Sequence, residues 1–174
     1  MSVFVETERL LLRELVADDA PGMFAMDSDP EVHRYLGNNP LVSITQSQEQ
    51  ITFIQQQYRE HGIGRWAVVD KQTGNFVGWS GLKLITEPLH QQTHFYELGY
   101  RFLRQYWGRG YATEAARASL HYGFDTLGLA AIYSMAEVHN QASNQVLRKL
   151  GFAFVEQFDF QGEPHNWYEI RRPQ

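Results

Sequence analysis

The chain has 174 residues, of which 43% are hydrophobic, and it carries a formal net charge of −5. This length and composition predict one globular domain over residues 1–174, not two domains. The negative charge argues against non-specific binding to nucleic acid. The sequence contains no cysteine, which excludes disulfides, thiolate metal sites and a cysteinyl intermediate.

The N-terminus lacks the basic and then apolar pattern of an export signal, and no apolar run approaches the roughly 18 residues of a membrane span. We therefore expect a soluble protein with no membrane partner, and the cytoplasm as its default compartment. The seven histidines are scattered without the spacing of metal ligands, so no metal is predicted. A homodimer and a monomer are both open.

Alternating and β-branched apolar runs predict seven strands. In chain order these cover residues 7–15, 66–70, 76–85, 96–102, 130–138, 152–160 and 166–171. The turn residues at 72–75 predict a hairpin between the second and third strands. The second, third and fourth strands then form an antiparallel meander.

Helical periodicity predicts helices between these strands. They cover residues 20–28, 30–36, 47–61, 111–127 and 141–150. Ser47 and Gln50 have the spacing of a capping box for the third helix, and Gly151 ends the last one. The pattern as a whole predicts an α/β protein (α+β mixed), with one mixed sheet flanked by helices.

The run Trp107-Gly108-Arg109-Gly110 lies between the strand at 96–102 and the helix at 111–127. Two glycines separated by one residue allow positive φ angles, so that consecutive N–H groups can point into one concavity. The following helix adds unpaired N–H groups and a partial positive charge. Strand, turn and helix therefore predict an anion site, suited to phosphate.

Two common nucleotide motifs do not fit this turn. A dinucleotide fingerprint needs Gly or Ala at the place of Thr113, and no G-x-x-x-x-G-K-S/T occurs anywhere in the sequence. These exclusions favour a pyrophosphate held by backbone amides.

The run 107–112, WGRGYA, resembles the Q/R-x-x-G-x-G/A motif of the GNAT acetyltransferases, with Trp107 at the first place and Ala112 at the last. The pieces ELGY, YWGRGYATEA, NQAS and LRKLGF, in this order, resemble the RimJ/RimL branch, which acetylates protein N-termini. The similarity extends over residues 7–167.

The resemblance implies a central sheet that splays between its fourth and fifth strands and holds acetyl-CoA in the gap. It places pantetheine on the backbone of Tyr100 and Phe102, and Asn140 against the cofactor. It assigns the pyrophosphate to Trp107, Gly108, Arg109, Gly110, Tyr111 and Ala112. Two plainer interpretations stay open: the glycines as a simple tight turn, and Asn140 as the N-cap of the following helix.

Without a cysteine, the expected chemistry is direct attack of a neutral amine on the thioester through a tetrahedral intermediate. Glu97 of the ELGY piece is the first candidate for the general base, Glu137 is its rival, and solvated strand carboxylates are the alternative for both. The tyrosine that many relatives use as an acid is Leu147 here. The resemblance therefore favours Ser143 as a hydrogen-bond donor to the departing thiolate, against a serine that only satisfies backbone.

The acceptor should enter beside the first helices and the last hairpin. Its predicted mouth consists of Asp27, Tyr35, Glu163, Trp167 and Tyr168. The function predicted from the resemblance is an acetyl-CoA-dependent N-acetyltransferase acting on a peptide N-terminal α-amine. A small-molecule amine acetyltransferase, for a polyamine or a drug, and a non-catalytic acyl-CoA-binding module are the alternatives.

Overall fold

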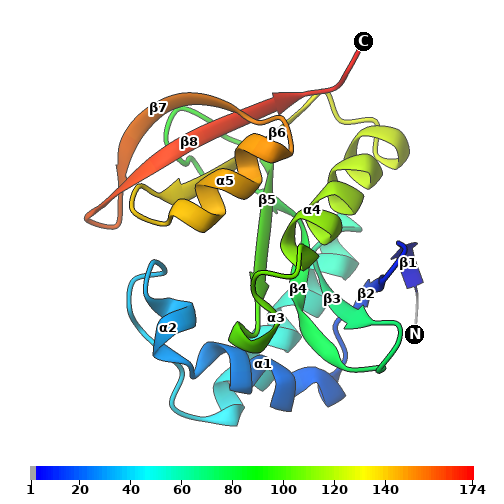
Figure 1. The fold of residues 1–174 in the computed structure, drawn as a ribbon. Helices are drawn as coiled ribbons and strands as arrows, with labels where there is room; N and C mark the ends of the chain where they lie inside the picture. Colours follow the sequence, from blue (N-terminus) through cyan, green and yellow to red (C-terminus); the bar gives the residue numbers. More distant parts are fainter. Residues whose placement is uncertain (1–2) are drawn as a thin grey trace.

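The computed structural model describes residues 3–174 and contains one eight-stranded sheet with helices on both faces (Figure 1). The strands are β1 (Val3–Glu6), β2 (Leu10–Glu14), β3 (Arg65–Asp70), β4 (Phe76–Ile85), β5 (Phe95–Phe102), β6 (Ala131–Glu137), β7 (Ala153–Phe160) and β8 (Glu163–Arg171). Their order is β1-β2-β3-β4-β5-β6-β8-β7, and neighbours are antiparallel except β5 and β6. The predicted mixed, mostly antiparallel sheet is confirmed. The seven predicted strands correspond to β2–β8, whereas β1 was not predicted.

The helices are α1 (Ala20–Asp27), α2 (Pro30–His33), α3 (Ile44–His61), α4 (Tyr111–His121) and α5 (Gln141–Lys149). One core cluster joins α1 and α3 to one face of the sheet. A larger cluster joins α4 and α5 to the other face, and it includes Leu82, Leu98, Ala115 and Leu147. Among residues 3–174, no helix combines the length and apolar character needed to cross a membrane.

The start of α3 differs from the prediction. The helix begins at Ile44, where Gln46 Oε1 accepts a hydrogen bond from the Ser43 N–H at 3.1 Å. Ser47, the predicted cap, is fully buried inside the helix. Two runs four residues apart both have the spelling of a capping box, and the earlier one forms the helix end.

The two faces of β5 carry different residues. The β4–β5 ladder runs without a bulge from Gly78↔Phe102 to Ile85↔Phe95, so side chains alternate strictly between faces. Leu98 and Phe102 belong to the core under α4. Arg101 points to the other face, where it bonds Asp27 of α1. Glu97 shares that face with Arg101 because it lies four residues away.

The sheet opens between β5 and β6. Only Glu97 and Tyr133 are paired in this parallel ladder, whereas β4 and β5 are paired along their whole length. One side-chain bond also spans the opening, from Ser134 Oγ to the Leu98 carbonyl at 2.9 Å. This confirms the predicted splay between the fourth and fifth predicted strands. Backbone groups beyond the single pair are left for another partner.

Candidate active site

The glycine turn leads directly into α4. Gly108 has φ +73° and Gly110 has φ +78°, both in the left-handed region that favours glycine. Gly110 is the N-cap of α4 and no side chain caps the helix. The first helical hydrogen bond runs from the Glu114 N–H to the Gly110 carbonyl at 3.1 Å. The three N–H groups before Glu114 therefore lack intrahelical acceptors and can bind an anion.

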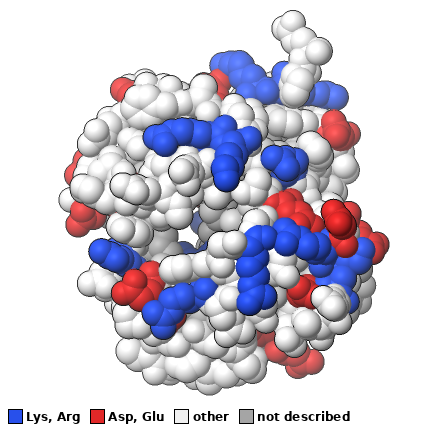
Figure 2. Space-filling model, viewed as in Figure 1, with Lys and Arg blue, Asp and Glu red and all other residues white. Residues whose placement is uncertain are grey.

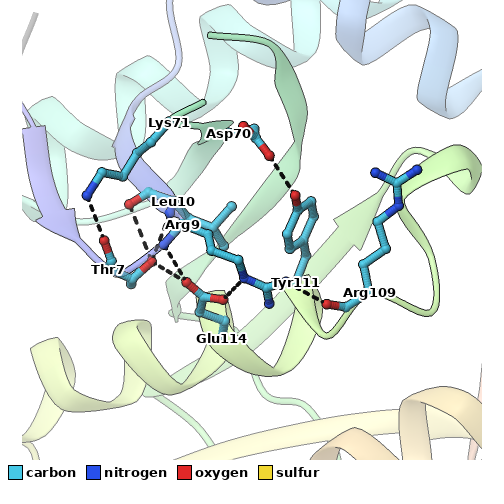
Figure 3. A network of polar contacts seen from close by, with 8 residues as sticks. All are labelled: Thr7, Arg9, Leu10, Asp70, Lys71, Arg109, Tyr111 and Glu114. Atoms are coloured by element: carbon cyan, nitrogen blue, oxygen red, sulfur yellow. Dashed lines mark hydrogen bonds and ion pairs between the residues drawn. The ribbon is translucent and has the colours of Figure 1, made fainter. Parts of the chain in front are cut away.

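The turn is held from behind by the connection between β1 and β2 (Figure 3). Arg9 Nη1 donates to the Arg109 carbonyl at 2.8 Å, and Arg9 Nε donates to Glu114 Oε2 at 2.6 Å. Thr7 Oγ1 donates to the other Glu114 oxygen at 2.7 Å. These bonds fix the position of the turn and pair the one acidic side chain in the first turn of α4.

Tyr111, the first residue of α4, points back into the sheet. Its hydroxyl donates to Asp70 Oδ2 at 2.6 Å, and this bond raises the pKa of Tyr111 and lowers that of Asp70. The Arg9 guanidinium lies over its ring, 4.5 Å from the centroid. The Tyr111 side chain therefore anchors the helix, and only its backbone is available to a ligand at the turn.

The end of β5 is bonded to the turn through Trp107. Its indole Nε1 donates to the Phe102 carbonyl at 2.9 Å, while about half of its side chain stays exposed. A carbonyl oxygen has two lone pairs, so one remains for another donor. The Arg109 guanidinium lies 5.3 Å from the centre of the Tyr106 ring, away from Arg9 (Figure 3).

Ser143 and Tyr100 meet across the opening between β5 and α5. Tyr100 Oη lies 2.9 Å from Ser143 Oγ and 3.2 Å from the Ser143 carbonyl oxygen, and its single proton can be donated to either. Burial raises the pKa of Tyr100 to about 12, although its bond with Ser143 acts in the opposite direction. The phenol therefore stays protonated at neutral pH and can donate to Ser143.

Asn140 caps α5, because its Oδ1 accepts from the Ser143 N–H at 3.2 Å. The side-chain oxygen of Asn140 therefore acts as the N-cap of the helix, as the plainer interpretation of this residue has it. Leu147 is fully buried in the core. A tyrosine function is therefore absent at that place, and the phenol beside Ser143 comes instead from Tyr100.

Asn144 holds α5 on the C-terminal strands. Its Nδ2 donates to the carbonyls of Glu137 and Asn140 at 3.0 and 2.8 Å. Its Oδ1 accepts from Asn166 Nδ2 at 2.9 Å and from the Tyr168 hydroxyl at 2.5 Å. All hydrogen-bonding positions of a buried amide are satisfied, so the N-terminus of α5 is fixed relative to β6 and β8.

The two candidate bases have different surroundings. Glu97 Oε1 forms an ion pair of 2.6 Å with Arg65 Nη2, and Arg65 Nη1 donates to the Glu97 carbonyl at 2.8 Å. Glu137 is buried and accepts from the His139 N–H at 3.0 Å, with His139 Nδ1 2.8 Å from its other oxygen. Both residues belong to the same face of the sheet, because Glu97 is paired with Tyr133 and Glu137 lies four residues further along β6. Of the two, Glu97 pairs with an arginine that also contacts β4, through the Gly81 carbonyl.

On that face, a cavity of about 250 Å³ lies between the sheet and helices α1 and α3. We call it the basic pocket. It is lined by Met23, Asp27, Gln50, Phe53, Ile54, Gln57, Arg65, Trp79, Lys83 and Arg101. Trp79 lies between two guanidinium groups, with Arg65 and Arg101 each 5.2 Å from its ring centroid. A Cβ on Gly99 would lie 2.8 Å from Arg65 Cζ, so only glycine leaves room for this arrangement.

Of the predicted acceptor mouth, the structure places Asp27 in the basic pocket. Trp167 and Tyr168 are wrong predictions for a mouth. Trp167 is 2% exposed within an aromatic cluster, and the fully buried Tyr168 bonds Asn144. Glu163 is exposed at the start of β8.

Sequence analysis missed most of the basic pocket. Its charged residues Arg65, Lys83 and Arg101 come from three strands, and only the register brings them together. A signal was present, because charged residues at alternate positions of otherwise apolar strands indicate a polar, covered face.

Within residues 3–174, no group of three or more His, Asp or Glu side chains is arranged to hold a metal ion. Figure 2 shows a hollow between the part formed by α5 with β6–β8 and the part formed by α1 and α2, and Lys and Arg atoms lie around it. The site therefore has two main parts. One is the opening between the parallel strands β5 and β6, and the other is the start of α4 at the glycine turn, which no side chain caps.

The family model of the acetyltransferase (GNAT) domain matches residues 9–153. This chain belongs to the GNAT acetyltransferase family. The N-acetyltransferase YoaA of Bacillus subtilis (strain 168), named as uncharacterized, is 33% identical to it, and the match covers 99% of each chain. The protein is thus a GNAT N-acetyltransferase, whose fold uses acetyl-CoA.

Two solved GNAT structures show how widely the fold is shared. Ribosomal-protein-S5-alanine acetyltransferase from Vibrio fischeri has a TM-score of 0.79 at 18% identity, covering 99% of this chain and 97% of the other. Spermidine N-acetyltransferase from Vibrio cholerae, in complex with CoA and spermine, has a TM-score of 0.75 at 20% identity, covering 95% and 97%. These likenesses support the fold, and the two named acceptors differ in chemistry.

The residues present fit coenzyme A. The left-handed glycine turn and the uncapped start of α4 suit a pyrophosphate, and a Cβ on Gly108 would meet nothing within 4 Å. The opening between β5 and β6 offers unpaired backbone groups to an extended amide chain.

Proposed function

We propose that this GNAT enzyme acetylates a primary amine by direct attack at the opening between β5 and β6, with the acceptor entering from the α1–α3 face. The single paired position in the β5–β6 ladder carries this proposal, because it leaves a slot that ends at the glycine turn. When bound, acetyl-CoA supplies an acyl group activated as a thioester. All other contributions come from the chain.

Cofactor binding is assigned to the residues predicted from the sequence. The N–H groups of the turn and of the first turn of α4 would hold the pyrophosphate, within Trp107, Gly108, Arg109, Gly110, Tyr111 and Ala112. The backbone of Tyr100 and Phe102 would bind pantetheine. Asn140 contributes through its position at the start of α5, because its oxygen already accepts from Ser143.

Ser143 is proposed to donate a hydrogen bond to the sulfur that leaves. Its Oγ lies 2.9 Å from Tyr100 Oη, so it can accept from the phenol while donating elsewhere. Tyr100 of β5 and Ser143 of α5 together supply the hydrogen-bond donor that the Leu147 side chain cannot provide.

Glu97 is proposed as the proton acceptor, because its carboxylate pairs with Arg65, which lines the basic pocket. Accepting a proton would weaken its ion pair with Arg65. A modest base suffices for an α-amine of pKa about 8, which costs only about 1.4 kcal/mol to be neutral at pH 7. Glu137, hydrogen-bonded to the exposed His139, is the alternative acceptor.

Two acceptor classes are in question. The sequence resemblance to the RimJ/RimL branch favours a peptide N-terminal α-amine. The volume of the basic pocket, about 250 Å³, favours a small-molecule amine, because it is below the roughly 300–1,000 Å³ of sites for drug-sized ligands and leaves room only for a small acceptor. We favour the small amine, with the first residue of a peptide as the competing acceptor.

The test is to incubate the protein with acetyl-CoA and a panel of peptides and small amines while following free thiol. The chain has no cysteine, so every thiol detected belongs to released coenzyme A. Thiol release that requires an acceptor supports the enzyme. Saturable binding of coenzyme A without release from any acceptor would instead support the acyl-CoA-binding module, which the buried Leu147 keeps open.

A further inference from the structure

The basic pocket carries an excess of positive charge. Arg65, Lys83 and Arg101 line it, and the carboxylates near them are Asp27 and Glu97. Each carboxylate is already engaged by one arginine: Asp27 Oδ1 by Arg101 Nη1 at 2.7 Å, and Glu97 Oε1 by Arg65 Nη2 at 2.6 Å. The third cation, Lys83, is therefore in excess.

Lys83 forms no ion pair with any residue in the range 3–174. It faces Glu97 across the β4–β5 ladder, but the Glu97 carboxylate bonds Arg65. The Lys83 ammonium lies 5.8 Å from the centre of the Phe53 ring of α3. Burial lowers the pKa of Lys83, and the charge of Arg65 lowers it further, against a smaller opposite effect of Glu97. A bound anion would relieve both costs.

Other polar atoms of the pocket also lack partners. Arg101 Nε is buried without a hydrogen bond inside the described chain. Asp27 Oδ2 and the Oε1 atoms of Gln50 and Gln57 are buried without a donor in the same part of the chain. Buried polar groups are normally paired, so these atoms indicate a missing partner. The missing partner should both accept and donate hydrogen bonds.

The charged groups of the basic pocket are not an ordinary solvated surface cluster. Asp27 is fully buried, and the side chain of Arg101 is 21% exposed. Burial lowers the pKa of Arg65, and the charge of Arg101 acts in the same direction, whereas Glu97 raises it. Three cations share this place with two carboxylates, so one positive charge has no counter-charge unless something negative binds there.

We propose that the basic pocket binds an acceptor amine that also carries an anionic group, a carboxylate or a phosphonate, with Lys83 and Arg101 holding the anion. The acceptor is thus of the amino-acid type and not a polyamine. This inference rests on the proposed function, since it names the acceptor class of the same site. A polyamine would add further positive charge to a pocket in which the cations already outnumber the carboxylates, and Coulomb repulsion disfavours this.

The first experiment compares amines that carry an anionic group with related amines that lack it. Thiol release from acetyl-CoA is measured with glycine and glycinamide, 4-aminobutyrate and butylamine, 3-aminopropylphosphonate, spermidine, and the standard amino acids with their amides. We expect the best acceptors to carry an anion and to exceed their uncharged partners at least tenfold in kcat/KM. Spermidine or the uncharged partners reacting as fast as the acids would overturn the proposal. The phosphonate arm separates the two anionic groups.

The second experiment removes the unpaired cation. Lys83→Met should raise KM for the best anionic acceptor about tenfold while leaving kcat and the affinity for coenzyme A unchanged. The variant should react with the uncharged analogue of that acceptor as the wild type does. The control is Arg59→Met, which removes an exposed cation from α3, outside the pocket lining. An equal loss for both members of the pair would contradict a role in binding the anion.

Failure of the proposed function is distinguished by a binding measurement. If coenzyme A binds in a calorimeter but no amine releases thiol, the acetyl-transfer proposal has failed. The same panel is then tested by the shift in Tm of the protein saturated with coenzyme A. Anionic amines that raise the Tm of the wild type more than that of Lys83→Met support the basic pocket as their site. A panel that shifts neither protein, or both equally, overturns it.

Discussion

The two faces of β5 differ in their chemistry, and in the proposed function they serve two different ligands. The face toward α4 and α5 presents Leu98, Tyr100 and Phe102, and its polar contacts are hydroxyl groups at the opening of the sheet. The opposite face presents Glu97, Gly99 and Arg101, and its contacts are ion pairs beneath α1. Period-two alternation separates the two environments by a single residue. In the proposed function, the cofactor side is therefore built from backbone and neutral donors, and the acceptor side from charges.

The largest expected effect comes from a substitution that disturbs only the charged face of β5. Gly99→Ala places a Cβ 2.8 Å from Arg65 Cζ and displaces the guanidinium from Glu97 and Gly81. Unpairing a buried charge costs about 3–5 kcal/mol, which urea unfolding should measure. The activity with the best acceptor should fall while the affinity for coenzyme A is kept.

The control for Gly99→Ala is a double-mutant cycle with Arg65→Met. Without a guanidinium to displace, Gly99→Ala should cost far less in that background. Additive losses would show that Gly99 acts independently of Arg65.

The next effect concerns the support of the hydroxyl pair. Asn144→Ala leaves the buried Tyr168 hydroxyl and two backbone carbonyls without their partner. We expect the free energy of unfolding to fall by about 2–3 kcal/mol. Asn75→Ala, at an exposed turn, is the matched control and should change it by less than about 0.5 kcal/mol. Equal losses in the two variants would contradict the role given to Asn144.

A smaller effect tests the glycine turn. Gly110→Val should weaken coenzyme A binding at least tenfold, about 1.4 kcal/mol, because a β-branched residue is strained at φ +78° and crowds the N–H groups. Gly74→Val is the control, since Gly74 has φ +73° in the β3–β4 turn and its Cβ would meet nothing within 4 Å. Both variants should lose similar stability, but only the first should lose affinity in calorimetry. Unchanged affinity would remove the pyrophosphate from this turn.

Ser143→Ala tests the neutral donor directly. Losing one hydrogen bond of ordinary strength should lower kcat about fivefold, about 1 kcal/mol, with little change in KM. Tyr100→Phe should act in the same direction, because its hydroxyl bonds Ser143. Wild-type turnover of Ser143→Ala would exclude the serine from the mechanism.

The smallest effect concerns pH. Burial raises the pKa of Glu114, but the bonds from Thr7 and Arg9 outweigh burial and hold it below its ordinary value of 4.5. A depressed carboxyl pKa stabilises the folded state above pH 4.5, and that stability is lost as the pH falls through the folded-state pKa. The gap in unfolding free energy between wild type and Glu114→Gln should therefore be widest near neutrality and close in acid. A gap that does not depend on pH would assign the stabilisation to packing.

The features that could be predicted from the sequence are those formed by consecutive residues. The strand, the glycine turn at 108–110 and the start of α4 are local, and so was the family resemblance that implied the opening beside β5. The basic pocket was not accessible in this way, because Trp79, Lys83 and Arg101 are brought together by the β4–β5 register and Asp27 arrives from α1. Strand β1 was not predicted because it is short and, within the described residues, pairs with β2 alone. Tyr168 failed as a mouth residue because aromatic composition does not distinguish core from surface.

The opening between β5 and β6 also divides the molecule into two plates. The backbone passes from one plate to the other once, through the short connection between α4 and β6. A ligand bound in this opening would contact both plates and would add to the core cluster that already joins them.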